Sequence, residues 1–382
     1  MTTGSAAVSR GARSGGQAPL AAGWHIWEVR KGQQPQIGDD AWDELVSAAD
    51  GYVTQTSGWL EYALATDYQR GVLIAGADEK GEGRAVAVGF VSEPRWPLRR
   101  FRTMHFPAYP STRGDAKALR EAVAVCERAA RERRCIAMDF VGIGQPDASS
   151  ALEGLGYATR ERLEYVFDLT QGEAALWEAV KRQHRKNTRR SERAGVRVVR
   201  LESLESVRTV RALQEEVARR HAARDDGFGL SSPESYEALH HALVARGFGR
   251  VYCSYLDGVP VSAALFLTFG RHAMSVYSGS NAQGLECYGE YGLYWHAMAE
   301  LSREGFIELQ LGSADLSVED PASPARGLHE FKLGFGAQTR RVVGASKTLR
   351  PVALRVHRSL QRVRSCIANG KRRSPPARAG AV

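Results

Sequence analysis

Residues 327–336 read Gly-Leu-His-Glu-Phe-Lys-Leu-Gly-Phe-Gly and place an aromatic side chain, Phe331, beside a cation, Lys332. The pattern predicts a short helix before this pair and a closing strand after it. A lysine in this position can stabilise an oxyanion or hold a phosphate, and an aromatic ring can stack on an unpaired base. The alternative is structural, with Phe331 in a core and Lys332 on the surface.

Further polar and aromatic residues have types that suit the same chemistry. Asp315 ends a predicted strand, where its carboxylate can accept a proton from an amine or cap the following loop. Tyr109, in a Phe-Pro-Ala-Tyr-Pro segment, is a candidate for the wall of a substrate cleft. Tyrosines near the start of a predicted helix are candidates for lining a substrate channel, although we expect at least one only to pack: Tyr288, Tyr291 and Tyr294.

A strongly basic helix is predicted over residues 171–195. Thr170 and Glu173 form a capping box at its start, and Gly195 is the left-handed residue that ends it. Its cations are Arg182, Lys186, Arg189 and Arg193 on one face, with Arg185 and Arg190 at the flanks. Like charges at this spacing weaken an isolated helix. We therefore predict that this face binds phosphate groups, the alternative being a solvated surface.

Composition and charge limit the classes of protein to consider. The chain has 382 residues, of which 43% are hydrophobic, enough for two domains with a core each. It has no apolar run of the ~20 residues that span a membrane. Residues 1–22 lack the apolar stretch of a signal peptide, and five scattered cysteines favour neither a disulfide framework nor a metal site. We expect a cytoplasmic monomer without a metal or an integral membrane segment.

The positive charge is concentrated in two zones. The formal net charge is +9, and residues 346–382 contain ten Lys or Arg and no acidic residue. Residues 181–200 contain nine Lys or Arg against a single acid, Glu192. Two basic zones in an otherwise nearly neutral chain indicate a polyanionic partner, most simply a nucleic acid.

One order of predicted elements occurs twice. The first half contains strands at 72–77 and 84–93, a loop at 101–106, a helix at 115–134 and a strand at 136–141. The second half contains strands at 250–256, 259–269 and 272–279, a helix at 290–304 and a strand at 306–312. Antiparallel strands followed by a helix that crosses to a parallel strand resemble the core of a GNAT acyltransferase.

Five motifs, taken in their order, resemble those of Fem-type aminoacyltransferases. They are Gln-x-x-x-Trp at residues 55–59, the junction at 167–170 with its basic helix, and the segments 292–298, 311–315 and 331–335. The resemblance implies an α/β protein with mixed sheets and two tandem GNAT-like domains, here without the long coiled-coil arm of some relatives. The segments that we predict are a disordered leader (1–22), an acceptor-side domain (23–170), the basic interdomain helix (171–195), a donor-side domain (196–345) and a basic C-terminal helix and tail (346–382).

The resemblance also implies an activity, the transfer of an amino acid from aminoacyl-tRNA to an amine. The acceptor is a peptidoglycan precursor or an antibiotic-type small molecule. An aminoacyl ester is already activated, so neither a covalent nucleophile nor a cofactor is expected. The resemblance implies that Lys332 stabilises the oxyanion or binds the terminal phosphate of the tRNA. One alternative is an acyl-CoA-dependent GNAT, although residues 278–286 lack the Gly-rich pattern that holds pyrophosphate. The other is a non-catalytic RNA-binding module.

Overall fold

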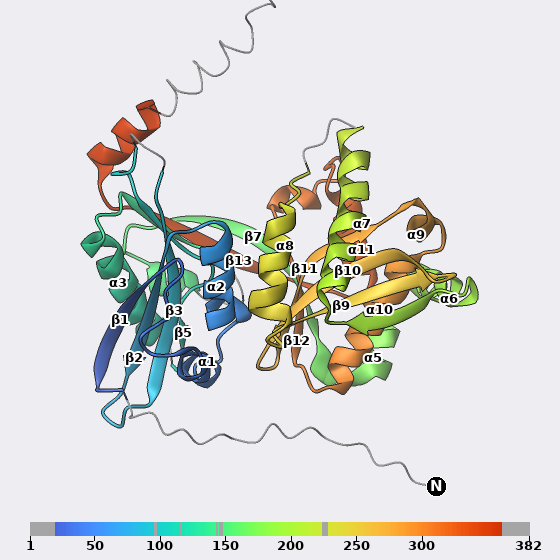
Figure 1. The fold of residues 1–382 in the computed structure, drawn as a ribbon, viewed down its shortest axis with the longest axis horizontal. Coiled ribbons are helices and arrows are strands. Elements are labelled where there is room, and N and C mark those ends of the chain that lie inside the picture. The colour runs from blue at the N-terminus through green and yellow to red at the C-terminus, as the bar shows by residue number, and fades with distance from the viewer. Residues whose placement is uncertain are drawn as a thin grey trace, which may run out of the picture.

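The computed structural model describes residues 20–360, except 95–97, 115, 143, 145–147 and 224–227. Two halves lie side by side and share one mixed sheet of thirteen strands (Figure 1). The predicted leader is described only from Leu20 onward, and the predicted tail only as far as Leu360. Of the described helices, none combines the length and apolar content needed to cross a bilayer.

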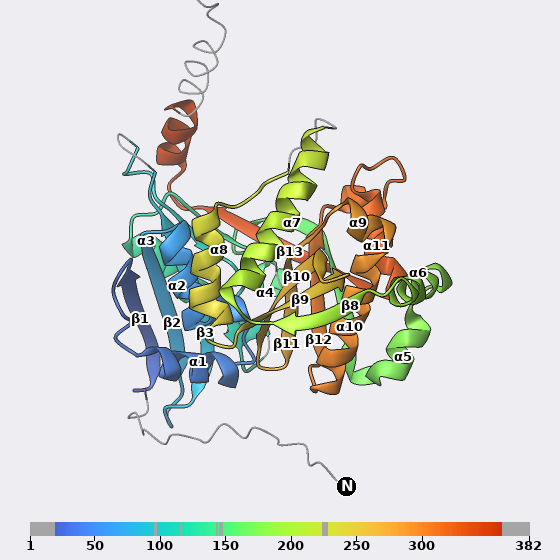
Figure 2. The same ribbon diagram turned by 45° about the vertical axis from the view of Figure 1, so that its right-hand side comes forward.

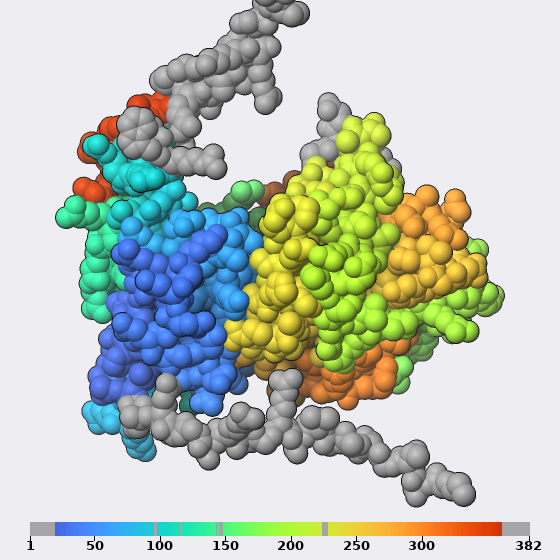
Figure 3. Space-filling view, in the orientation of Figure 1, coloured from blue at the N-terminus to red at the C-terminus, as the bar shows by residue number. Residues whose placement is uncertain are grey.

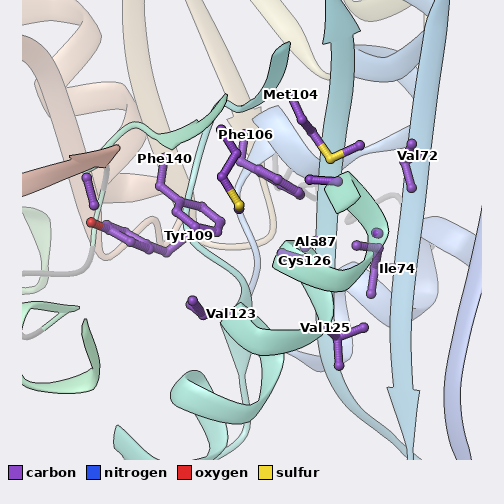
Figure 4. Close-up of a cluster of buried hydrophobic side chains, with 14 of the residues drawn as sticks. Val72, Ile74, Ala87, Met104, Phe106, Tyr109, Val123, Val125, Cys126 and Phe140 are labelled. Carbon is purple, nitrogen blue, oxygen red and sulfur yellow. The ribbon is translucent and has the colours of Figure 1, made fainter. Parts of the chain in front are cut away.

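In the N-terminal half, a sheet is covered by helices on both faces. Its elements are β1 (Gly23–Arg30), α1 (Asp39–Ala48), α2 (Ser57–Thr66), β2 (Arg70–Ala77), β3 (Gly83–Ser92), β4 (Thr103–Phe106), β5 (Ser111–Thr112), α3 (Ala116–Glu132), β6 (Ala137–Phe140), α4 (Ala148–Leu152) and β7 (Ala158–Asp168). Alternate side chains of β2 point to opposite faces of the sheet, because a strand has a period of two residues. Val72 and Ile74 pack beneath α3, while Leu73 and Ala75 pack beneath α1 and α2 (Figure 4).

The C-terminal half follows the same plan. Its elements are α5 (Gly172–Ala179), α6 (Arg182–Arg193), β8 (Arg197–Leu201), α7 (Leu204–Ala222), α8 (Pro233–Leu239), β9 (Gly249–Leu256), β10 (Val259–Phe269), β11 (His272–Ser280), α9 (Ala282–Glu286), α10 (Gly289–Arg303), β12 (Glu308–Ala314), α11 (Arg326–Gly334) and β13 (Gln338–Thr348). A helix at 351–360 follows and packs on the N-terminal half. Short turns of helix lie at Val53–Gln55, Leu169–Gln171, His240–Val244 and Leu316–Glu319. Ala264 and Phe266 face the core beneath α5, α10 and α11, and Leu265 faces α7 and α8.

The halves exchange one strand each. The sheet order is β1-β2-β3-β4-β6-β13-β7-β12-β11-β10-β9-β8. Thus β13 from the end of the chain pairs with β6, from Ala345↔Phe140 to Thr348↔Ala137, and β7 pairs with β12. The limits 23–170 and 196–345 therefore divide the sequence but not the sheet, because each half is completed by a strand of the other.

A second contact between the halves joins α2 to α8 and the turn that follows it, along the boundary visible in Figure 3. Arg246 forms ion pairs across this boundary with Asp39 (3.3 Å) and Glu61 (3.2 Å). Gly58 lies so close to the opposite backbone that a Cβ there would be 2.6 Å from the carbonyl oxygen of Ala242. The two halves are therefore packed against each other as well as sharing strands.

The single helix predicted over residues 171–195 is two helices, α5 and α6. Val180 is buried and extended (ψ 126°), and the Lys181 N–H donates to the Gly334 carbonyl (2.8 Å) instead of continuing the helix. The predicted N-cap is also wrong, because the Asp168 side chain accepts from the Thr170 N–H. The predicted C-terminal signal is confirmed, since Gly195 follows α6 with φ 84°.

Two smaller predictions also differ from the structure. Phe331 and Lys332 lie within α11 rather than between a helix and a strand. Residues 101–106, predicted as a loop, contain β4, whose residues 103–106 pair with β6 in parallel. Four residues are too few to show a strand period, so only the pairing partners identify β4.

Candidate functional site

Three segments that are far apart in sequence meet at one place: α6, the start of α10, and α11 (Figure 2). His184 on α6 connects them, because its Nε2–H donates to the Phe331 carbonyl (3.0 Å) and its ring lies 4.9 Å from that of Tyr291. Burial lowers the pKa of His184, and the hydrogen bond to the Phe331 carbonyl offsets part of this effect. The basic helix is therefore attached directly to the helix that carries Lys332.

An aromatic cluster fills the space between α10 and α11. Phe331 lies 5.3 Å from Tyr291, 5.6 Å from Tyr294 and 5.2 Å from Phe335, measured between ring centroids, and all three pairs are edge-to-face. Tyr294 is 7% exposed and Phe335 1% exposed, whereas Phe331 and Tyr291 are half-buried. Phe331 and Tyr291 are therefore the members that a ligand can reach without unpacking the core.

Lys332 is a partly buried lysine whose ammonium group lies over an aromatic ring. Its Nζ is 4.4 Å from the centroid of Tyr165 on β7, and among the described residues no carboxylate pairs with it. Burial lowers its pKa from the ordinary value to about 8. The Tyr165 hydroxyl and His329 Nδ1 lie 2.8 Å apart beneath it. This lysine is held in place by packing and lacks a counter-ion, so an anionic ligand group can supply one.

Tyr288 forms the corner at which α10 begins. It has a left-handed backbone (φ 59°), and its hydroxyl accepts from Arg190 (3.1 Å), whose guanidinium also lies 5.5 Å from the ring centroid. Gly292, one turn later, lets α6 approach α10, since a Cβ there would lie 2.9 Å from the Ser191 hydroxyl. Arg190 thus orients Tyr288 and is itself committed to protein contacts.

The face predicted for α6 is the exposed one. Arg182, Lys186, Arg189 and Arg193 are exposed, while Arg185 and Arg190 are half-buried. Arg185 pairs with Glu178 (2.9 Å) and Arg189 lies 5.7 Å from the Trp177 ring. The four-residue spacing thus predicted the exposed face correctly, and the half-buried flanking cations Arg185 and Arg190 have partners within the protein.

Two candidates lie away from this place. Tyr109 is 1% exposed in the core of the N-terminal half, where its hydroxyl donates to the Val343 carbonyl (2.8 Å) (Figure 4). Tyr109 therefore does not line a cleft. The sequence could not show this, because an aromatic residue beside a strand end suits a core as well as a cleft wall.

Asp315 caps the turn at Leu316–Glu319 and pairs with Arg160, whose hydrogen bond lowers the pKa of the carboxyl. Its role as a proton acceptor stays a prediction.

Two residues of the site, Glu290 and His184, were not predicted from the sequence. Glu290, in the first turn of α10, hydrogen-bonds the Ser280 side chain, and burial raises the pKa of its carboxyl. A partly buried carboxyl with a raised pKa is suited to proton transfer. An acidic residue at a helix start is also ordinary capping chemistry, so the sequence offered no signal to distinguish the two. His184 lies in a helix rich in cations, where nothing in the sequence distinguishes it.

The contact between α6 and α11 depends on Gly334. A Cβ at this position would lie 2.0 Å from the His184 ring. We expect Gly334→Ala to lower the free energy of unfolding by about 1–3 kcal/mol, because the ring must move out of a packed site. Thermal or urea unfolding measures this change. Gly327→Ala, on the same helix with no atom within 4 Å of its Cβ, is the control and should be neutral or slightly stabilising; equal effects at both positions would contradict the contact.

The comparisons with known proteins agree with this architecture. Residues 180–320 match the family model described as an acetyltransferase (GNAT) domain. The crystal structure of FemX is similar over 84% of this chain and 98% of its own, with 15% identity and a TM-score of 0.70. The C-terminal domain of a putative lysylphosphatidylglycerol synthetase from Agrobacterium fabrum covers 82% of this chain and 95% of its own, with 17% identity and a TM-score of 0.52. No curated protein matches the chain.

At these identities the likeness concerns the fold. The topology explains it: β4 runs parallel to β6, and β11 parallel to β12, so each half has the strand–helix–strand crossover of a GNAT core. β11 and β12 pair only from His272↔Glu308 to Met274↔Gln310 and separate beyond this point, on the side where α10 begins. The chain therefore has the Fem-like fold, with two tandem GNAT-like domains and mixed sheets.

Proposed function

We propose that the protein is a tRNA-dependent aminoacyltransferase, which forms an amide by moving an amino acid from aminoacyl-tRNA to an amine. The acceptor is a peptidoglycan precursor or an antibiotic-type small molecule. One observation carries the proposal: α6, whose outer face carries four exposed cations, is joined on its inner face through His184 to the helix that holds Lys332. A polyanion bound on α6 would therefore lie one helix away from the partly buried ammonium group of Lys332, which has no described carboxylate partner.

The roles in the reaction follow from the chemistry of an activated ester. The amine nitrogen attacks the ester carbonyl, an oxyanion develops, and the carbon–oxygen bond to the terminal ribose breaks. Lys332 supplies positive charge to the oxyanion, and the half-buried ring of Phe331 receives the terminal adenine. Glu290 accepts the proton that the attacking amine loses, and the ribose oxygen finally takes up a proton.

An acyl-CoA donor is the second candidate, favoured by the family model that matches residues 180–320. The turn that would hold the pyrophosphate of CoA argues against this donor. In this chain the left-handed Tyr288 immediately precedes α10, and Glu290 places a carboxyl in the first turn. Backbone N–H groups at a helix start bind anions best where glycines leave them open. A side chain and a carboxyl at this point disfavour a pyrophosphate.

Single-turnover transfer tests the proposal. A pool of radiolabelled aminoacyl-tRNAs is mixed with the enzyme and amine acceptors that include cell-wall precursors and aminated metabolites, with and without RNase. We expect labelled acceptor only where the RNA is intact. Transfer from acyl-CoA in a parallel reaction, with none from tRNA, would instead identify a CoA-dependent enzyme. RNA binding without transfer from either donor would identify a binding module.

The basic face has its own expected effect. Replacing Arg182, Lys186 and Arg189 together by alanine should weaken tRNA binding and reduce the slope of log K against log salt by about 2, because each lost phosphate contact removes a released counterion. Filter binding over a range of salt concentrations measures both quantities. Arg208→Ala on α7, whose guanidinium already pairs with Glu237, is the control and should leave the slope unchanged. An unaltered slope in the triple variant would mean that the tRNA binds to another surface of the protein.

A further inference from the structure

The helix at residues 351–360 is attached to the N-terminal half by one side only. Ala353 and Leu354 pack on a small core that includes Leu98 and Phe101. His357 is 9% exposed, and its ring stacks on Phe101 with 5.1 Å between centroids. In both ribbon views the helix projects from the edge of the N-terminal half, at the opposite end of the molecule from α6 (Figures 1 and 2).

Next to its packed side, this helix carries an exposed apolar stripe. Val352, Val356 and Leu360 recur every four residues and so lie in one row along the helix. Their exposed fractions are 67%, 47% and 41%, and they make up three of the seven large exposed hydrophobic residues in the described part of the chain. An apolar row of this kind on a docked helix lacks a partner within the described protein.

Cations flank the stripe. Arg355 and Arg358 are exposed on the same helix, Arg350 immediately precedes it, and Arg99 and Arg100 lie on the loop that leads to Phe101. Among the described residues none of these five has an acidic partner. The sequence from 361 to 382 adds six further Lys or Arg and no Asp or Glu. The charged residues of this helix and of the sequence that follows it are therefore all cationic.

We propose that this helix binds the surface of an anionic lipid bilayer, with Val352, Val356 and Leu360 inserted among the acyl chains and the arginines at the headgroups. Apolar side chains in a row with arginines beside them are the composition of an interfacial helix, and the arginines gain from a negative surface potential. RNA phosphates would pair with the arginines but leave the stripe in water. A second copy of the chain would bring two cationic helices together.

This surface is independent of the proposed transfer reaction. It lies on the half that does not carry Lys332, and occupying it leaves the cationic face of α6 free for another ligand. A protein attached in this way would work at the membrane, where lipid-linked or lipid acceptors are concentrated. Failure of the membrane test would leave the aminoacyl-transfer proposal as it stands, and the reverse also holds.

Vesicle flotation of the full chain tests the proposal. The probes are vesicles of phosphatidylcholine alone and vesicles in which roughly one lipid in three is phosphatidylglycerol, at about 0.15 M salt. We expect binding to the anionic vesicles and little to the neutral ones. The double variant Val356→Asp/Leu360→Asp should bind about tenfold more weakly or worse, since two carboxylates replace inserted side chains.

A matched variant shows whether the stripe itself is needed for vesicle binding. Val259→Asp changes an equally exposed apolar residue (52%) on β10, far from the stripe in sequence, and should bind vesicles like the wild type. Thermal unfolding checks that each variant is folded. Wild-type binding by the double variant, or no binding of the wild-type chain to anionic vesicles, would overturn the proposal. So would a double variant that loses tRNA affinity or dimerisation in sedimentation velocity while its vesicle binding is unchanged.

Discussion

Lys332→Ala should lower kcat for aminoacyl transfer by about 100- to 1,000-fold, which is the usual effect of removing one group that faces an oxyanion. The KM for aminoacyl-tRNA should change little, because the cations of α6 supply the affinity for RNA. Single-turnover and steady-state kinetics measure the two quantities separately. A raised KM with an unchanged kcat would assign Lys332 to the terminal phosphate instead, the other role that its position allows.

The chain offers a matched control for this variant. The Lys347 ammonium group also lies over a tyrosine ring, 5.0 Å from the centroid of Tyr157, but it pairs with Glu127 (2.6 Å) in the N-terminal half. Lys347→Ala should therefore reduce stability without reducing kcat. Intact turnover in Lys332→Ala would remove this residue from the mechanism, and an equal loss in both variants would indicate a general structural effect.

The pH dependence of transfer should show the titration of Lys332. Burial lowers its pKa to about 8, so its positive charge is present below this pH and lost above it. We expect the contribution of Lys332 to kcat/KM, which reports groups of the free enzyme, to fall about tenfold per pH unit above pH 8. Lys332→Arg keeps its charge throughout this range and should lack that decline.

The ratio of the two kcat/KM values isolates the titration of Lys332. Measured with one acceptor, the ratio of wild-type to Lys332→Arg kcat/KM cancels the titration of the acceptor amine, and it should bend near pH 8. Stability gives a second check, with the opposite sign. The folded chain loses the proton at a lower pH than the unfolded chain, so the free energy of unfolding should rise with pH between about 8 and 10.5 relative to Lys332→Met. A flat ratio and a flat stability difference would together contradict the lowered pKa.

Local patterns sufficed for the long elements. The strands predicted at 250–256, 259–269 and 272–279 are β9, β10 and β11 to within a residue, because alternation and short turns mark a meander in the sequence itself. The helix predicted at 290–304 is α10. The four-residue spacing on α6 predicted which cations are exposed, since a helix face is set by the 3.6-residue period alone.

The site needed contacts that the sequence does not encode locally. The break between α5 and α6 depends on a distant part of the chain, because the Gly334 carbonyl accepts the N–H of Lys181, the residue that precedes α6. Tyr109 lies in a core where its hydroxyl donates to the carbonyl of Val343, which belongs to the exchanged strand β13. The sequence by itself thus determined the elements, the cationic face and the Phe331-Lys332 pair. Tertiary structure alone decided that these meet, because their burial, pKa values and neighbours arise from packing between distant segments.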